Sequence, residues 1–208
     1  MMLYPRVSLY AMMLAAAGIP LYIHLPQFAS LELGIGLGAL GGILLGIRLF
    51  DLVQDPLIGW AIDRWPQAQL WFALAAAAGL AIGFPLLFGL TEGPLVTLRL
   101  VLVLLLLFSA YSLGMILLYG RSATLAKRTG PQELLTLAAF REAGMLSGVI
   151  LAAVAPAVLV GLGASGRGYA AFGALLGGFA LFTAHLTNCS TWSNNITRQP
   201  LTAMALSE

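Results

Sequence analysis

The sequence predicts an all-α membrane protein that forms a bundle of six transmembrane helices. Of its 208 residues, 60% are hydrophobic and only 9% are charged, whereas about a quarter of the residues are charged in an ordinary soluble domain. The 10 Lys and Arg and 8 Asp and Glu side chains are too few to cover a soluble core of this size. The mean hydropathy is +0.95, and long apolar segments recur between short polar ones.

The first three helices follow from the length of their apolar segments, because about 20 apolar residues are needed to cross the hydrocarbon core. Residues 7–28 follow Arg6, and this run is too long for the apolar part of a signal peptide. Residues 34–62 begin in a glycine-rich stretch and end before a charged pair. Residues 70–90 end at the turn-forming sequence of residues 91–94.

The other three helices complete a single transmembrane domain, residues 1–186. Residues 95–119 precede the longest connecting segment, 120–133. Residues 134–162 and 169–186 are separated by a glycine-rich turn. After His185, Thr, Asn and Ser replace Leu, Ala and Gly. We expect residues 187–208 to be a polar tail, which is either a disordered cytoplasmic end or the aberrant terminus of a truncated or frameshifted reading frame.

The distribution of Lys and Arg predicts the orientation, because cytoplasmic loops carry the excess of these residues. Arg99 and Arg167 fall on one side of the predicted bundle. The other side, which also carries both termini, has six cations: Arg6, Arg64, Arg121, Lys127, Arg128 and Arg198. We therefore expect an integral protein of the cell (inner) membrane with both termini in the cytoplasm.

Composition also argues against several classes of protein. The net charge is only +2, and no basic patch with interleaved aromatic residues occurs, so we expect no nucleic-acid partner. A single cysteine, Cys189, allows no internal disulfide and no cysteine cluster for zinc or an iron–sulfur centre. We expect the lipid bilayer to be the main partner, no cofactor to be bound and no enzymatic activity.

Glycine and proline indicate how the helices pack. The chain has 24 glycines, and six of them gather at the start of the second predicted helix, at positions 34, 36, 38, 41, 42 and 46. Such a surface favours close packing against a neighbouring helix, or a contact that slides during a transport cycle. Pro20, Pro26 and Pro156 are expected to kink the first and fifth helices.

Charged residues inside the predicted spans are the main functional signal. The second helix contains Arg48, Asp51 and Asp55, and the fifth contains Arg141 and Glu142. Each charge at the bilayer centre costs about 2.5 to 3.5 kcal/mol on insertion scales, so these side chains must face one another or water. The spacing of i, i+3 and i+7 places the three residues of the second helix on one face.

Two carboxylates one helical turn apart suit the binding of a hard cation or the sharing of a proton. Asp51 and Asp55 are therefore the candidate cation site, with sodium or a proton as the coupling ion. The sequence also allows an ion pair between Asp55 and Arg141, since both are predicted at similar depth in the membrane. The alternative interpretation is that these charges form a buried network that only fixes the packing of the helices.

Three stretches carry a resemblance to a known family. The segment RLFDLVQDPLIGWAIDR, from Arg48 to Arg64, resembles the helix-two signature of the glycoside-pentoside-hexuronide:cation symporters, the melibiose-permease-like branch of the major facilitator superfamily. It joins an acidic pair, an Asp-Pro dipeptide and the Gly-x-x-x-Asp-Arg sequence that begins the loop after helix two. The segments GIPLYIHLP (18–26) and AFREA (139–143) resemble parts of helices one and five.

The resemblance implies a six-helix bundle that is one half of a secondary transporter, since the superfamily has two such halves around a central site. By resemblance, Asp51 and Asp55 would bind the coupling cation. Arg48, Arg141 and Glu142 would form a central charge network that can hold the solute. Gly59, Asp63 and Arg64 would form a cytoplasmic gate.

The expected function is symport of a sugar-like or other small polar solute with sodium or protons. It requires a second six-helix half or self-association. One alternative is an inactive or structural membrane fragment. Another is an intramembrane metal-dependent transferase, although the chain lacks the Asp-Gly-x-x-Ala-Arg stretch of the CDP-alcohol transferases.

Overall fold

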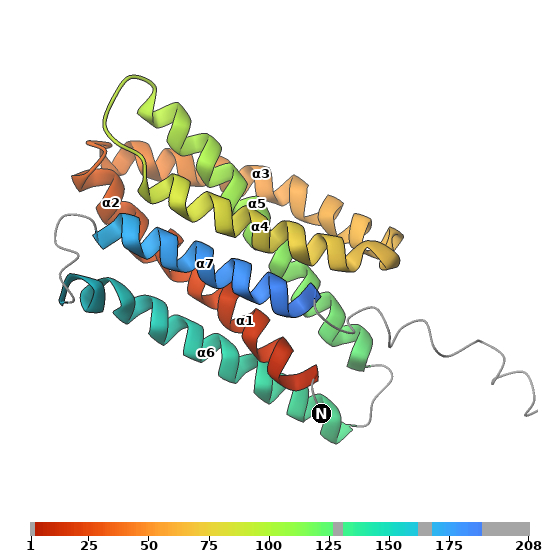
Figure 1. Ribbon diagram of the computed structural model, residues 1–208. Coiled ribbons are helices and arrows are strands. Elements are labelled where there is room, and N and C mark those ends of the chain that lie inside the picture. Colours follow the sequence, from red (N-terminus) through yellow and green to blue (C-terminus); the bar gives the residue numbers. More distant parts are fainter. Residues whose placement is uncertain (1–2, 127–130, 162–167, 189–208) are drawn as a thin grey trace, which may run out of the picture.

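The protein is helical throughout residues 3–126, 131–161 and 168–188, which are the residues that the computed structural model describes, apart from short turns. Figure 1 shows the helices side by side, with those of the six long spans running roughly along one direction. Within the described residues they follow in the order α1 (Leu3–Ile19), η1 (Pro20–His24), α2 (Leu25–Leu31), α3 (Leu37–Arg64), η2 (Pro66–Ala68), α4 (Gln69–Phe88), α5 (Val96–Ala126), α6 (Pro131–Gly161) and α7 (Gly168–Asn188). The predicted all-α class is confirmed.

The described helices form six spans that are long and apolar enough to cross a membrane. These are Tyr4–Leu31, Leu37–Arg64, Pro66–Phe88, Val96–Gly120, Gln132–Leu159 and Gly168–Leu186. The predicted bundle of six transmembrane helices is therefore confirmed. The predicted polar tail lies outside the described residues from position 189 onwards.

The first span is not one regular helix, because it changes its hydrogen bonding in the middle. Between α1 and α2, η1 is a π-helical segment in which the N–H of Leu25 donates to the carbonyl of Pro20. Pro20 has no N–H of its own to give to the preceding turn, which favours such a local rearrangement. Short π-helical segments occur frequently at functional sites. By contrast, α6 runs through Pro156 as one helix.

The bundle is held together where glycines let helix backbones touch. A Cβ atom at Gly144 or Gly148 of α6 would collide with the carbonyl oxygens of Ser8 and Met12 on α1. The backbones of α1 and α6 are therefore in direct contact, as small residues allow in membrane bundles.

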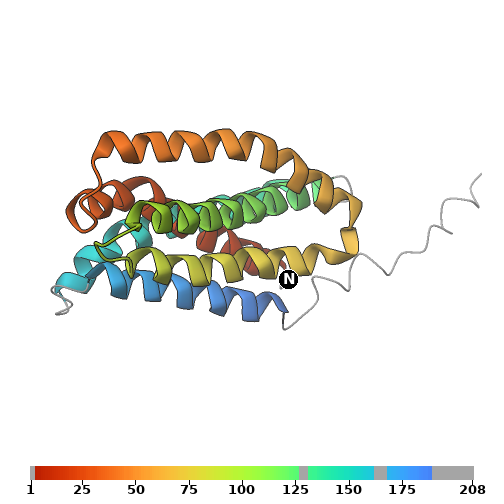
Figure 2. The same ribbon diagram turned by 90° about the horizontal axis from the view of Figure 1, so that it is seen from above.

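Glycines also bring α4 against its two neighbours. A Cβ at Gly177 of α7 would lie 2.7 Å from the carbonyl oxygen of Ala81 on α4, and one at Gly79 of α4 would lie 2.6 Å from the Cβ of Ala110 on α5. Consequently α4 lies between α5 and α7 with little space on either side. Figure 2 shows α4 and α7 as close, nearly parallel neighbours.

The two helices that carry the predicted charges are the least covered by the rest of the bundle. Only 17% of the most apolar window of α3 and of α6 is buried, against 56% in the first span. Figure 1 shows α3 and α6 along opposite edges of the bundle. The glycines at the start of α3 do not form the close contact within this bundle that the sequence suggested, since nothing lies within 4 Å of a Cβ at Gly36, Gly38, Gly41, Gly42 or Gly46.

Candidate functional site

The helix α3 packs against α5 through a stripe with helical spacing, and Asp51 is part of that stripe. Buried or half-buried residues of α3 recur every three or four positions: Leu40, Ile43, Leu44, Ile47, Asp51, Gln54, Asp55, Ile58 and Ile62. Asp51 is only 5% exposed. An acidic residue this buried within a predicted membrane span requires partners, because the uncompensated charge is costly there.

Arg48 connects three helical segments. Its Nη1 donates to Oδ2 of Asp51 at 2.9 Å, one turn further along α3. Its Nη2 donates to the hydroxyl of Tyr22, which comes from η1. The guanidinium carbon lies 4.7 Å from the ring centre of Phe108 on α5, within the range of a cation–π contact. Even so, the Arg48 side chain is 45% exposed in the bundle.

Two carboxylate oxygens at this site have no hydrogen-bond partner. Oδ1 of Asp51 and Oδ1 of Asp55 are both buried and unpaired within the described part of the chain. The two carboxylates stand one helical turn apart on α3, so their charges repel each other when both are ionised. Buried polar atoms are nearly always hydrogen-bonded, so the pair has unused capacity to accept a proton or to ligate a cation. Carboxylate oxygens are the ligands that hard cations prefer.

Gln54 stands between the two aspartates on the same stripe. Its Oε1 accepts a hydrogen bond of 2.9 Å from the Ser109 hydroxyl of α5. This bond fixes α3 against α5 at the level of the carboxylates. Gln54 and Ser109 do not stand out in the sequence, since an isolated amide and an isolated hydroxyl form no pattern until the two helices are placed together.

A second charged group lies on α6. Nε and Nη2 of Arg141 both donate to Oε1 of Glu142, at 3.0 and 2.7 Å. The guanidinium carbon lies 4.8 Å from the ring centre of Tyr119 on α5. The Tyr119 hydroxyl in turn donates to the sulfur of Met145 on α6, at 3.9 Å. Arg141 is largely covered, with 17% of its side chain exposed, whereas Glu142 is 53% exposed.

A tyrosine accompanies each of the two charged groups. Tyr22 of η1 contacts Arg48, and Tyr119 of α5 contacts Arg141. A third tyrosine, Tyr111 of α5, lies against α1, where its hydroxyl would come within 3.3 Å of a Cβ at Gly18. Polar side chains thus occur on α3, η1, α5 and α6. We call this set the polar band: Asp55, Asp51, Arg48, Tyr22, Tyr111, Tyr119, Arg141 and Glu142.

Within the described residues, Asp55 and Arg141 do not form the ion pair that the sequence left open. Among the described residues, Arg141 pairs with Glu142, its neighbour in the chain. The physical reason is the arrangement of the helices, because α3 and α6 lie along opposite edges of the bundle (Figure 1). Similar depth in the membrane does not make two residues lateral neighbours.

The three residues of the predicted gate lie at the end of α3, away from the polar band. In the part of the chain that the structure describes, nothing lies within 4 Å of a Cβ at Gly59, and Asp63 and Arg64 are exposed. The rings of Trp60 and Trp65 meet edge to face at 5.7 Å and flank this end. Neither Asp63 nor Arg64 forms an ion pair within the residues that the structure describes.

The comparison with known families agrees with a transport role. A family model described as MFS/sugar transport protein matches residues 7–203, a region that includes all six spans. The chain belongs to this family. It is thus a member of the major facilitator superfamily and an integral membrane transport protein. The family is one of transporters and not of enzymes. No solved structure matches the chain.

Proposed function

We propose that this chain forms one half of a cation-coupled symporter of the melibiose-permease-like branch, carrying a sugar-like or other small polar solute together with sodium ions or protons. The observation that supports this most directly is the pair of buried, unpartnered oxygens on Asp51 and Asp55. Two such oxygens one turn apart form a cation site when the ion is present and repel each other when it is absent.

Arg48 couples the cation to the solute in this proposal. It neutralises one of the two carboxylates and also holds Tyr22 at the surface of the bundle. A cation that binds Asp51 and Asp55 weakens the ion pair between Asp51 and Arg48, because the cation and the guanidinium compete for the same carboxylate. Arg48 and Tyr22 then become available to hydrogen-bond a polar solute, and Arg141 and Glu142 offer further donors and acceptors at the other end of the polar band.

A second six-helix bundle completes the transport path. Arg48 and Glu142 lie within spans and are about half exposed in this bundle. Facing lipid would cost about 2.5 to 3.5 kcal/mol for each such charge, so another protein surface and a water-filled path cover the polar band. The second half is the rest of a longer polypeptide, another chain or a second copy. Rocking of the two halves then opens the path alternately to either side.

The proposed orientation rests on the excess of Lys and Arg that the sequence predicts for the cytoplasmic side. Both termini lie in the cytoplasm, the chain lies in the cell (inner) membrane, and Gly59, Asp63 and Arg64 face the cytoplasm, where they form the gate. The open space at Gly59 and the exposure of Asp63 and Arg64 support a contact with the second half.

The alternatives gain less support. In a network that only fixes helix packing, the buried carboxylate oxygens would be expected to be paired, and two of them are not. For a metal-dependent transferase, a cluster of ligands is required. In the ranges that the structure describes, no group of three or more His, Cys, Asp or Glu side chains could hold a metal ion.

Calorimetric titration of the purified full chain with sodium chloride, at several pH values, tests the proposal. The native chain is expected to bind sodium or to take up a proton, and Asp51→Asn and Asp55→Asn are expected to abolish this binding. Asp63→Asn is the matched control, because it makes the same change in an exposed aspartate of the same helix. Cation binding that persists in a folded Asp51→Asn, Asp55→Asn double variant would reject the assignment.

A further inference from the structure

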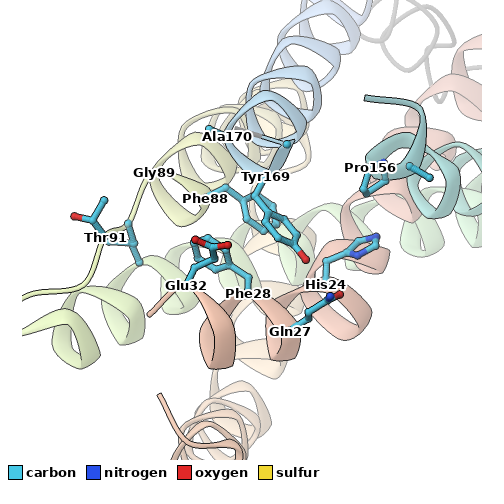
Figure 3. Close-up of a pocket in the computed structure, with 13 residues that line it drawn as sticks. His24, Gln27, Phe28, Glu32, Phe88, Gly89, Thr91, Pro156, Tyr169 and Ala170 are labelled. Atoms are coloured by element: carbon cyan, nitrogen blue, oxygen red, sulfur yellow. The ribbon is translucent and has the colours of Figure 1, made fainter. Parts of the chain in front are cut away.

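A cavity of about 840 Å³ lies at the end of the bundle away from the N-terminus. Its walls come from η1 and α2, from the end of α4, from α6 near Pro156 and from the start of α7. Figure 3 shows side chains of several kinds around it, including an imidazole, an amide, a carboxylate and a tyrosine hydroxyl. We call it the end pocket.

The π-helical segment of the first span carries His24, which lines this pocket. Tyr22 and His24 are two residues apart in η1, so their side chains leave the helix on nearly opposite sides. Tyr22 reaches Arg48 in the polar band, whereas His24 packs edge to face on Phe172 of α7 at 5.4 Å. Nε2 of His24 is buried without a hydrogen-bond partner among the described residues. Such an atom is a ready anchor for a polar ligand, because leaving it unpaired is unfavourable.

Hydrogen-bonding side chains and aromatic rings form the rest of the wall. Gln27 and Glu32, on and just after α2, are exposed at the pocket, and Tyr169 is half-buried there. The rings of Phe28, Phe88 and Tyr169 pack on one another with centres 5.2 to 5.6 Å apart. Phe28 and Phe88 are only 3% and 4% exposed, so they support the ring of Tyr169, which gives the pocket most of its aromatic surface. Beside this ring the pocket offers an amide, a carboxylate, an imidazole and a phenol hydroxyl.

We propose that the end pocket is a second solute-binding site, separate from the polar band, for a neutral polyhydroxylated ring such as a mono- or disaccharide. Such a molecule has apolar C–H faces that pack on aromatic rings and many hydroxyls that need several donors and acceptors at once. The volume lies within the usual range of small-molecule pockets. The choice of solute class rests on the proposed function, while the site itself rests on the side chains around the cavity.

The end pocket is built from a single six-helix bundle, so its occupancy does not require the second half. In the proposed orientation it lies on the outer side of the membrane. A solute held there is close to the entrance of the transport path before the central site opens.

Equilibrium dialysis of the purified full chain with radiolabelled glucose, galactose and sucrose tests this site. The native chain is expected to bind at least one of the three. Gln27→Ala and Glu32→Gln are expected to weaken that binding at least tenfold, and Tyr169→Phe several-fold. Glu133→Gln is the matched control, because Glu133 is an exposed carboxylate on α6, in the first turn of that helix.

The outcomes separate the two proposals. Sugar binding that is lost in the aspartate variants and unchanged in a Gln27→Ala, Glu32→Gln double variant overturns the second site and leaves the symporter proposal standing. Sugar binding that depends on Gln27 and Glu32, in a chain that binds neither sodium nor protons, supports the second site and rejects cation coupling. No binding of any of the three sugars at millimolar concentrations overturns the second site.

Discussion

The guanidinium of Arg48 on α3 donates to the hydroxyl of Tyr22 in η1, so the charges of the second span are hydrogen-bonded to the π-helical segment of the first. This contact lies beside the ion pair that Arg48 makes with Asp51. Arg48 therefore contacts the carboxylate pair that we assign to the cation, through Asp51, and also a hydroxyl that is exposed at the surface of the bundle.

Replacing Arg48 by glutamine is expected to strengthen cation binding. Arg48→Gln removes a positive charge that lies 2.9 Å from Oδ2 of Asp51, so a cation at Asp51 and Asp55 no longer competes with it. We expect the sodium affinity measured by calorimetry to rise by roughly tenfold, which corresponds to about 1.4 kcal/mol. Arg64→Gln, at the exposed end of the same helix, should leave the affinity unchanged. An unchanged or weaker affinity in Arg48→Gln would contradict this role.

Adding a methyl group to α6 at its contact with α1 is expected to destabilise the bundle. A Cβ at Gly148 would overlap the carbonyl oxygen of Met12, so Gly148→Ala forces the two backbones apart at a cost of about 1 to 3 kcal/mol. Gly42→Ala is the matched control, because nothing lies within 4 Å of a Cβ there. Thermal unfolding of both variants in the same detergent measures the difference. Equal midpoints would show that the α1–α6 contact is not as close as described.

Labelling of single cysteines checks the orientation. In a Cys189→Ser background, Gly93→Cys is expected to react with a membrane-impermeant maleimide added to intact cells, since residue 93 lies in the short segment between α4 and α5. Gln67→Cys, in η2 at the other end of the bundle, is expected to react only after the membrane is permeabilised. The reverse pattern would place the termini outside.

The sequence predicted the six spans and the shared face of Arg48, Asp51 and Asp55 because both depend on properties within one helix. Apolar length determines which segments cross the membrane, and helical spacing determines which residues share a face. The structure adds that Asp51 lies in the stripe that packs against α5.

Features that depend on how helices pack together could not be read in this way. Tyr22 and Ser109 gain their roles only from the positions of α3, η1 and α5 relative to one another. The sequence does not distinguish the glycines near the start of α3 from Gly144 and Gly148. Within this bundle, however, Gly144 and Gly148 contact a neighbouring helix and the glycines at positions 36, 38, 41, 42 and 46 do not. A pattern of small residues shows that a close approach is allowed but not which surface approaches.

Arg48 and Arg141 each have their counter-ion on their own helix, Asp51 for Arg48 and Glu142 for Arg141. A rigid tilt of α3 or α6 therefore carries each ion pair along intact, and only the weaker contacts with Tyr22, Phe108 and Tyr119 must be broken and remade. Tilting α3 or α6 within the bilayer therefore leaves both positive charges balanced, and the Arg48 pair loosens only when a cation competes for Asp51.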